Sequence, residues 1–215
     1  MTTEQAKKTT DEIFDLYEKH GGAEYAGEKV SQLEHMAQAA QLAEEEGHDE
    51  EVVLAAFLHD IGHIAPVPSN GHDLLQANMK DASSSPDRLM GGFGIKDHEE
   101  LGAEFLREKG FSKKIVRLVE SHVEAKRYLT IKDPSYYAQL SEASKRTLEY
   151  QGGPMTEEEA AAFEKYPLFS LIINMRKWDE QAKIEHRPLP DLDRYKEMML
   201  HHLESSVPSS PGRIL

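Results

Sequence analysis

Several histidines in this chain have positions that suit a metal site. The sequence contains eleven histidines, most of which lie at expected helix ends or in polar loops. Four others lie in or beside apolar segments with helical spacing: His35, His59, His98 and His122. Each alone would more often be a core histidine than a ligand, but four on four successive helices favour a shared site. Imidazole and carboxylate ligands without sulfur suit iron, manganese or zinc in a site open to substrate.

The pair His59-Asp60 directly follows the apolar run 52–58. An ionised carboxylate beside an imidazole is costly to bury unless a metal or another partner neutralises it. Adjacent side chains on a helix do not face each other, so both can serve one cluster if the aspartate lies between two metal ions. Gly62 would then let the chain turn sharply away. The alternative is a capped helix end with a core histidine, which the dipeptide alone would favour.

Helical patterns dominate the segments that must position these residues, and strand patterns are nearly absent. The predicted helices cover residues 11–19, 29–46, 49–60, 97–109, 112–122, 141–150, 167–184 and a last segment from 191, with shorter ones near 136 and 156. Asp49 and Ser112 are predicted N-caps, and capping boxes are predicted at Asp97–Glu100 and at Thr156–Glu159. The sequence therefore predicts an all-α fold.

A long stretch from Pro66 to Lys96, rich in Pro, Ser, Gly and Asn, separates the second and third helices that carry candidate ligands. A loop of this length in a compact domain is usually a lid, a binding loop or partly disordered. No repeat or domain boundary is evident elsewhere. We therefore expect one domain over residues 1–215, with its core at about 11–193 and a frayed tail at 205–215.

The composition excludes several classes of function. A net charge of −14 over 215 residues is unsuited to binding nucleic acid or an anionic membrane. The absence of cysteine removes disulfides, iron–sulfur clusters and thiolate zinc sites, and it suits a reducing cytoplasm. No apolar stretch is long enough to span a bilayer, and the N-terminus lacks a signal-peptide pattern. We expect a cytoplasmic protein with a small-molecule partner, and the oligomeric state stays open.

The candidate ligands occur in an order that resembles the HD-domain superfamily of all-α metalloproteins: His35, His59-Asp60 and Asp179. The further histidines, His98 and His122, resemble the dinuclear branch of that superfamily. Local strings resemble bacterial organophosphonate oxygenases that act on 2-amino-1-hydroxyethylphosphonate or on its trimethylammonio analogue. These strings are residues 24–28, 31–35, 121–130, 140–144 and 175–179. The resemblance extends from about Asp11 to Asp193, and the stretch 66–96 is its main departure.

The resemblance implies a helical HD-domain bundle that holds two iron ions as a mixed-valent Fe(II)/Fe(III) pair. The ligands of one iron would be His35, His59, Asp60 and Asp179, and those of the other Asp60, His98 and His122, with Asp60 bridging. Four neutral imidazoles and only two carboxylates leave an excess of positive charge for an oxyanion. The implied reaction uses O2 as co-substrate to cleave a carbon–phosphorus bond, and it gives phosphate with glycine or glycine betaine.

The resemblance also implies that two cationic residues contact the phosphonate. Lys126 follows His122 by four residues, and Arg176 precedes Asp179 by three, so each would share a helix face with a ligand. The planar fork of the arginine suits bidentate binding of a phosphonate. The alternatives are a solvated lysine, and an arginine that pairs with the same aspartate or with a neighbouring glutamate.

Four further residues complete the implied substrate site. Glu28 would receive a substrate ammonium, and His63 and Ser144 would donate hydrogen bonds to the phosphonate. Tyr25 would occupy an iron position until substrate displaces it, although a tyrosine that merely packs is the alternative. We thus expect catalytic roles for Tyr25, Glu28, His63 and Lys126. The sequence does not distinguish a primary amine from a trimethylammonium group on the substrate.

Two other functions fit the same order of ligands. An HD-type phosphohydrolase would cleave a nucleotide or a small phosphate ester with a metal-activated water. A signalling or scaffold domain with a degenerate HD core would have broken ligands, whereas all six are intact here. The second pair of histidines and the Tyr25–Glu28 element favour the oxygenase over the hydrolase.

Overall fold

The structure is a computed structural model, and it describes residues 1–25, 27–66 and 90–205. Over those residues it contains ten α-helices, one 3-10 helix and an isolated β-bridge between Glu24 and Ser31. In chain order the elements are α1 (Thr3–His20), α2 (Gln32–Glu45), α3 (Glu50–Leu58), η1 (Ile61–His63), α5 (His98–Glu108), α6 (Lys113–Lys132), α7 (Tyr136–Gln139), α8 (Glu142–Tyr150), α9 (Glu157–Phe163), α10 (Phe169–Gln181) and α11 (Asp193–Ser205). The predicted all-α fold is confirmed. Most of the predicted lid at 66–96, and the predicted tail after residue 205, lie outside the described residues.

Side-chain caps begin most of the helices that carry the candidate ligands. Ser31 begins α2 through a capping box with Glu34. Asp49 and Ser112 cap α3 and α6 by accepting backbone N–H groups in the first turn, as predicted. The predicted capping box at Thr156 is also present at the start of α9. These caps satisfy N–H groups that have no partner within the helix.

The predicted capping box at Asp97 and Glu100 is wrong. Asp97 has a left-handed conformation, with a φ angle of 59°, and its side chain makes no capping hydrogen bond. This turn places His98 at the first position of α5, where it is buried. Two helices are also longer than predicted. Helix α1 starts at Thr3 because Thr2 forms a capping box, and α6 continues past residue 122 to residue 132.

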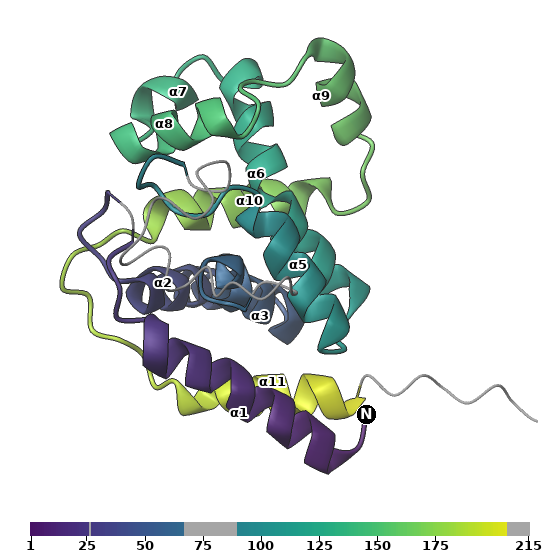
Figure 1. The fold of residues 1–215 in the computed structure, drawn as a ribbon. Coiled ribbons are helices and arrows are strands. Elements are labelled where there is room, and N and C mark those ends of the chain that lie inside the picture. Colours follow the sequence, from purple (N-terminus) through teal and green to yellow (C-terminus); the bar gives the residue numbers. More distant parts are fainter. Residues whose placement is uncertain (26, 67–89, 206–215) are drawn as a thin grey trace, which may run out of the picture.

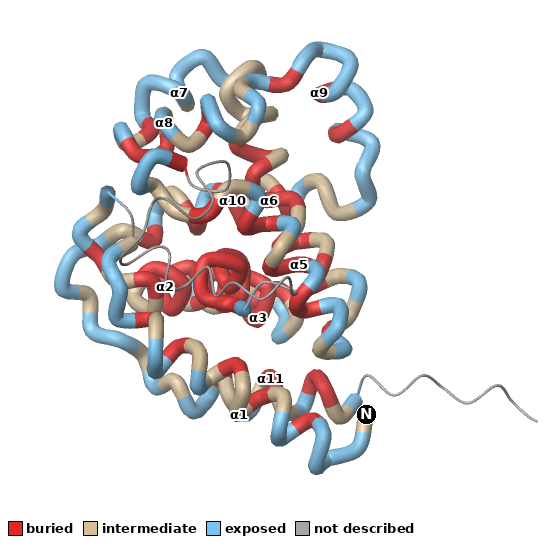
Figure 2. The backbone as a smooth tube through the Cα atoms, in the orientation of Figure 1, coloured by how far each residue is buried: buried red, intermediate tan, exposed pale blue. Residues whose placement is uncertain are grey.

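Helices α2 and α3 form the centre of the bundle. Figure 1 shows them between the α1–α11 pair below and α5, α6 and α10 above, with α7, α8 and α9 at the top. The central helices are the most deeply buried part of the chain (Figure 2), whereas α7 to α9 are largely exposed. Among the described helices, none combines the length and apolar character required to cross a membrane.

Helix α3 is apolar on all sides because other helices surround it. Every residue from Val52 to Leu58 is buried. The ring of Phe57 stacks on Tyr195 of α11, with 4.7 Å between ring centroids, and the Tyr17 hydroxyl of α1 donates to the Phe57 carbonyl at 2.8 Å. Helices α1 and α11 therefore fix the C-terminal end of α3, which leads directly into His59 and Asp60.

A contact between two glycines brings η1 against α5. A Cβ atom on Gly62 would overlap the carbonyl oxygen of His98 and would press on the backbone of Gly102. A Cβ on Gly102 would lie 3.1 Å from the backbone nitrogen of Gly62. Only glycine at residue 62 allows this approach, which sets the distance between Asp60 and His98.

The Gly62→Ala substitution should therefore separate η1 from α5. We expect a loss of about 1–3 kcal/mol in the free energy of unfolding, as for other overpacked sites, together with weaker metal binding. Denaturant unfolding and metal analysis measure the two effects. Gly22→Ala is the matched control, because a Cβ there meets no atom within 4 Å. Equal stability of the two variants would contradict the role given to the glycine contact.

Candidate metal centre and substrate pocket

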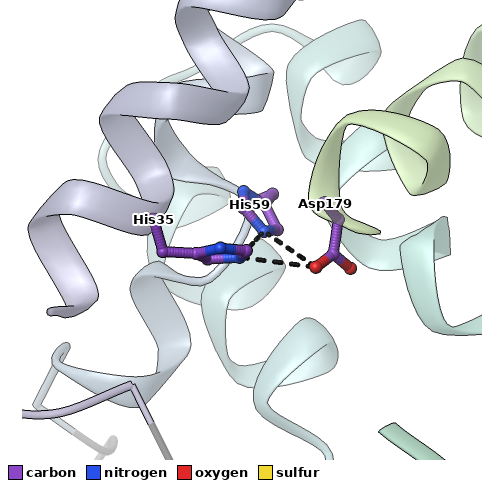
Figure 3. Close-up of side chains that lie close together, drawn as sticks. All are labelled: His35, His59 and Asp179. Carbon is purple, nitrogen blue, oxygen red and sulfur yellow. Dashed lines mark hydrogen bonds and ion pairs between the residues drawn. The ribbon is translucent and has the colours of Figure 1, made fainter. Parts of the chain in front are cut away.

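The first pair of candidate ligands faces Asp179 across the middle of the bundle. The Nε2 atoms of His35 on α2 and His59 after α3 lie 3.1 Å apart. Asp179 Oδ1 on α10 lies 3.4 Å from His35 Nε2 and 4.0 Å from His59 Nε2. Figure 3 shows the three side chains pointing toward one another. Three elements far apart in the sequence thus contribute donor atoms to one point.

The second pair of histidines faces the other side of Asp60. The Nε2 atoms of His98 on α5 and His122 on α6 lie 3.0 Å apart. Asp60 Oδ1 is 3.2 Å from His98 Nε2 and 3.4 Å from His122 Nε2. Its other oxygen, Oδ2, lies 3.5 Å from the Nε2 atoms of both His35 and His59. The carboxylate of Asp60 therefore lies between the two pairs, with one oxygen turned to each.

Hydrogen bonds to the backbone fix the tautomer of all four histidines. Each Nδ1 lies close to a carbonyl oxygen, which can only accept, so Nδ1 carries the proton and Nε2 presents a lone pair. The carbonyl partners are Ala182 for His35 at 2.9 Å, Ala56 for His59 at 2.8 Å, Ile95 for His98 at 3.2 Å and Val119 for His122 at 2.7 Å. Such anchoring by the second ring nitrogen is typical of metal-ligating histidines.

Two further observations show that these residues fit metal ions. Asp60 Oδ2 and Asp179 Oδ1 are buried, and within the described residues neither oxygen has a hydrogen-bond partner. Two nitrogen lone pairs that face each other at 3.0–3.1 Å repel unless a cation lies between them. Nitrogen ligands about 2.1 Å from one metal are separated by about 3.0–3.4 Å when they subtend 90–109°. The observed separations agree with this spacing.

The pKa values show that the centre attracts positive charge. Burial would lower the pKa of His35 and of His98, but hydrogen bonds and charges of the neighbouring aspartates outweigh it, raising the pKa of His35 to about 9 and that of His98 above its ordinary value. Burial lowers the pKa of His59 to about 4, which keeps the imidazole neutral. Burial alone would raise the pKa of Asp60 and of Asp179, but the imidazoles around Asp60 and the Arg176 guanidinium beside Asp179 outweigh it. The pKa of each aspartate is held well below its ordinary value, so both carboxylates are ionised.

His63 lies beside His98 and Asp60, but its Nδ1 accepts a hydrogen bond, whereas Nδ1 of each of the four candidate histidine ligands donates one. Its ring stacks on His98, with centroids 4.0 Å apart, and its atoms are close enough to those of Asp60 and His98 to share a metal ion with them. Its Nδ1 accepts the backbone N–H of Ile95 at 3.3 Å. The proton must then reside on Nε2, so His63 can act as a neutral hydrogen-bond donor in the pocket.

A pocket of about 50 Å³ opens beside these donor atoms. Its walls include the five residues predicted to contact substrate, and also Tyr25, which was predicted to occupy an iron position. The five are Glu28, His63, Lys126, Ser144 and Arg176. The ring of Tyr25 stacks on His35, with 3.9 Å between centroids. The pocket is also lined by residues that the sequence did not single out, including Gln32, Phe93, Thr147, Gln151 and Lys183.

Lys126 is a buried residue of the pocket wall and not a solvated surface lysine. Only 3% of its surface is exposed, and its Nζ donates to the Thr147 hydroxyl at 2.9 Å. Burial lowers the pKa of Lys126 to about 7. An anionic ligand in the pocket would restore the cationic form, so Lys126 is suited to bind one.

Arg176 is engaged by neighbouring side chains, which is the alternative considered from its sequence position. Its guanidinium forms ion pairs with Asp179 and Glu180, and its Nε donates to the Tyr136 hydroxyl at 2.8 Å. The arginine thus holds the Asp179 carboxylate in place. A contact with the phosphonate stays a prediction.

Glu28 has an internal cation as its partner. Glu28 Oε1 accepts from Lys183 Nζ at 2.8 Å and from the Ser141 hydroxyl at 2.6 Å. Lys183 also lies 3.4 Å from the Ser144 hydroxyl. Lys183 follows Asp179 by four residues, as Lys126 follows His122, and this repeated spacing is a sequence signal that could have indicated Lys183.

Asp60→Ala should remove at least one of two bound metals, because the carboxylate of Asp60 faces both sets of nitrogen donors. Metal analysis of the purified protein measures this content per chain. Asp15→Ala is the matched control, since Asp15 is exposed and pairs with Lys19 on the surface of α1. If Asp60→Ala protein kept two metals per chain at unchanged affinity, the bridging position of Asp60 would be excluded.

Comparisons with known proteins identify the family. The HD domain family matches residues 32–209. An uncharacterised protein of Acanthamoeba polyphaga mimivirus is 41% identical over 95% of this chain and 86% of its own length. A [1-hydroxy-2-(trimethylamino)ethyl]phosphonate dioxygenase (glycine-betaine-forming) of Leisingera caerulea is 40% identical over 87% of this chain and 86% of its own. A hydroxymethylphosphonate dioxygenase of Gimesia maris is 36% identical over 90% and 88%. The chain therefore belongs to the HD-domain family, in the group that contains these phosphonate dioxygenases.

Proposed function

We propose that this protein is a di-iron oxygenase that cleaves the carbon–phosphorus bond of a small 1-hydroxyalkylphosphonate. The observation that carries the proposal is the carboxylate of Asp60 between two pairs of histidines whose Nε2 lone pairs converge. The names of two relatives support the chemistry. The sequence predicts 2-amino- or 2-trimethylammonio-1-hydroxyethylphosphonate as substrate. One relative's name adds hydroxymethylphosphonate as a third candidate.

The first set of ligands in this proposal is His35, His59, Asp60 and Asp179, and the second is Asp60, His98 and His122. When bound, a mixed-valent Fe(II)/Fe(III) pair would supply the activation of O2 and a positive charge for the oxyanion. In the balanced reaction, one hydroxyphosphonate and one O2 give one carboxylic acid and one phosphate. The enzyme is proposed to act in the cytoplasm on this small molecule.

The pocket residues bind and orient the phosphonate in this proposal. The ammonium of Lys126 and the Nε2–H of His63 are donors on the pocket wall beside the metal ligands, and the hydroxyl of Ser144 adds a third. Charge-assisted hydrogen bonds to an anion are the strongest that side chains form. The hydroxyl of Thr147 holds Nζ of Lys126 in position before substrate arrives. The phosphonate thereby fixes the carbinol carbon of the substrate beside the centre.

Tyr25 is placed to respond to substrate binding. Its ring stacks on His35, and it lines the same pocket as the donors to the phosphonate. Burial raises the pKa of the Tyr25 phenol well above 10, and the charges of Asp60 and Asp179 raise it further. Without a metal cation the phenol is therefore neutral. A metal would offset these effects and allow the phenol oxygen to act as a ligand that substrate displaces.

The phosphohydrolase is the second candidate function, since it uses the same ligands. The pocket volume of about 50 Å³ disfavours a nucleotide as substrate. One water needs roughly 10–15 Å³ on this measure, so the pocket holds a few waters and a phosphonate of few heavy atoms suits it better. The names of the two relatives also favour oxygen chemistry.

Oxygen uptake distinguishes the two functions directly. Iron-loaded protein should consume O2 and release phosphate in a ratio of about one to one when given a 1-hydroxyalkylphosphonate, because the balanced reaction requires it. An oxygen electrode and a phosphate assay on the same sample measure the ratio for each of the three candidate substrates. Phosphate release that continues without O2 would show hydrolysis in place of oxidation.

Lys126→Met should weaken the use of every hydroxyphosphonate substrate. We expect kcat/KM to fall by about ten- to a hundredfold, the loss that follows from removing a hydrogen bond between charged groups. Metal content should stay unchanged because Lys126 is not among the proposed ligands. Lys113→Met, an exposed residue of the same helix, is the matched control. Wild-type kcat/KM in the Lys126→Met protein would exclude a contact between Lys126 and the phosphonate.

A further inference from the structure

Lys183 lies two residues beyond the end of α10, and its backbone is held on both sides. The carbonyl oxygen of Ala182 accepts a hydrogen bond from Nδ1 of His35 at 2.9 Å. The buried amide of Gln38 donates to the Ile184 carbonyl at 3.0 Å and accepts the Ile184 N–H at 3.0 Å. Lys183 therefore extends from a fixed backbone position that is tied to a proposed metal ligand.

The side chain of Lys183 contacts the two groups of the pocket that could bind a substrate ammonium, the carboxylate of Glu28 and the ring of Tyr25. Its Nζ lies 2.8 Å from Glu28 Oε1 and 6.0 Å from the centroid of the Tyr25 ring. A carboxylate pairs with a primary ammonium, and an aromatic face attracts a quaternary one. The side chains of Lys183 and Glu28 are each only 15% exposed, so solvent screens their ion pair weakly.

Among the residues that the structure describes, Glu28 is the one carboxylate of the pocket wall that is not a proposed metal ligand. Asp60 and Asp179 belong to the proposed metal ligands, and Arg176 pairs with Asp179 and Glu180. Lys126 adds a further cation to the pocket wall. Both contacts of Glu28 use Oε1, so a substrate with a cationic nitrogen must either displace Lys183 or share the single negative charge of Glu28 with it. A substrate without this charge leaves the Lys183–Glu28 pair intact.

We propose that Lys183 is a specificity-determining residue that fills the ammonium-binding part of the pocket itself. The substrate class that follows is a 1-hydroxyphosphonate without a cationic nitrogen, such as hydroxymethylphosphonate. This inference rests on the proposed function, and it departs from the amino or trimethylammonio substrate predicted from the sequence. The trimethylammonio compound is the most disfavoured of the three, because it has no N–H for Glu28 and the face of Tyr25 is already occupied.

Lys183→Met tests the inference, because methionine has a similar length and no charge. We expect the wild-type holoenzyme to prefer hydroxymethylphosphonate to the 2-amino and 2-trimethylammonio compounds in kcat/KM. In the variant this preference should fall by about ten- to a hundredfold, as expected when a competing charged hydrogen-bond donor is removed. Anaerobic calorimetry of the same three compounds should show the same shift in Kd. Lys29→Met is the matched control, since Lys29 is 80% exposed and pairs with Glu185 at 3.0 Å.

The possible outcomes separate the inference from the proposed function. Absence of O2 uptake with all three phosphonates would contradict the proposed function. Turnover in which the wild type already prefers a cationic substrate, or in which Lys183→Met leaves the preference unchanged, would contradict the inference alone. If the variant does not fold, as judged by its melting temperature and metal content, the wild-type preference and the wild-type Kd values still decide the question.

Discussion

The carboxylate of Asp60 is the group on which the arrangement of the bundle depends. It is ionised, only 1% exposed and surrounded by four imidazoles that turn lone pairs toward it. Without a cation, such an arrangement of acceptors is repulsive and costly to bury. The folded chain is therefore complementary to bound cations, and folding and metal binding are coupled.

The segments that carry the proposed metal ligands also contribute two lysines to the substrate pocket. Lys126 follows the proposed ligand His122 by four residues on α6, and Lys183 follows Asp179 by four residues, two positions beyond the end of α10. Both lysines line one pocket. Lys126 is held by a hydroxyl and is open to an anion, whereas Lys183 is already paired with Glu28. In the proposed function, the anionic end of a substrate would meet the available cation of Lys126, and the opposite end would meet the ion pair of Lys183 and Glu28.

The candidate ligands were accessible from the sequence because each is a polar residue in an apolar context. His35, His59 and His122 interrupt buried helical patterns, which marks them as candidates, and the number of such histidines on successive helices favours a shared site. The start of α5 could not be predicted in the same way, because Asp97 and Glu100 have the residue types of a capping box but Asp97 has a left-handed conformation that this local pattern does not predict. The Lys183–Glu28 pair joins residues 155 positions apart, and it depends on how the chain leaves α10. Local patterns contain no information on such a contact.

The anchors of the four imidazoles differ in how far along the chain they reach. His59, His98 and His122 each donate to a carbonyl three residues earlier, so a single helical turn or loop orients each ring. His35 instead donates to Ala182, which lies 147 residues further along the chain. Contacts within their own segments thus orient His59, His98 and His122. The orientation of His35 requires the end of α10, which also brings Arg176, Asp179 and Lys183 to the centre and the pocket, so a chain that ended before α10 would lack all of these contributions.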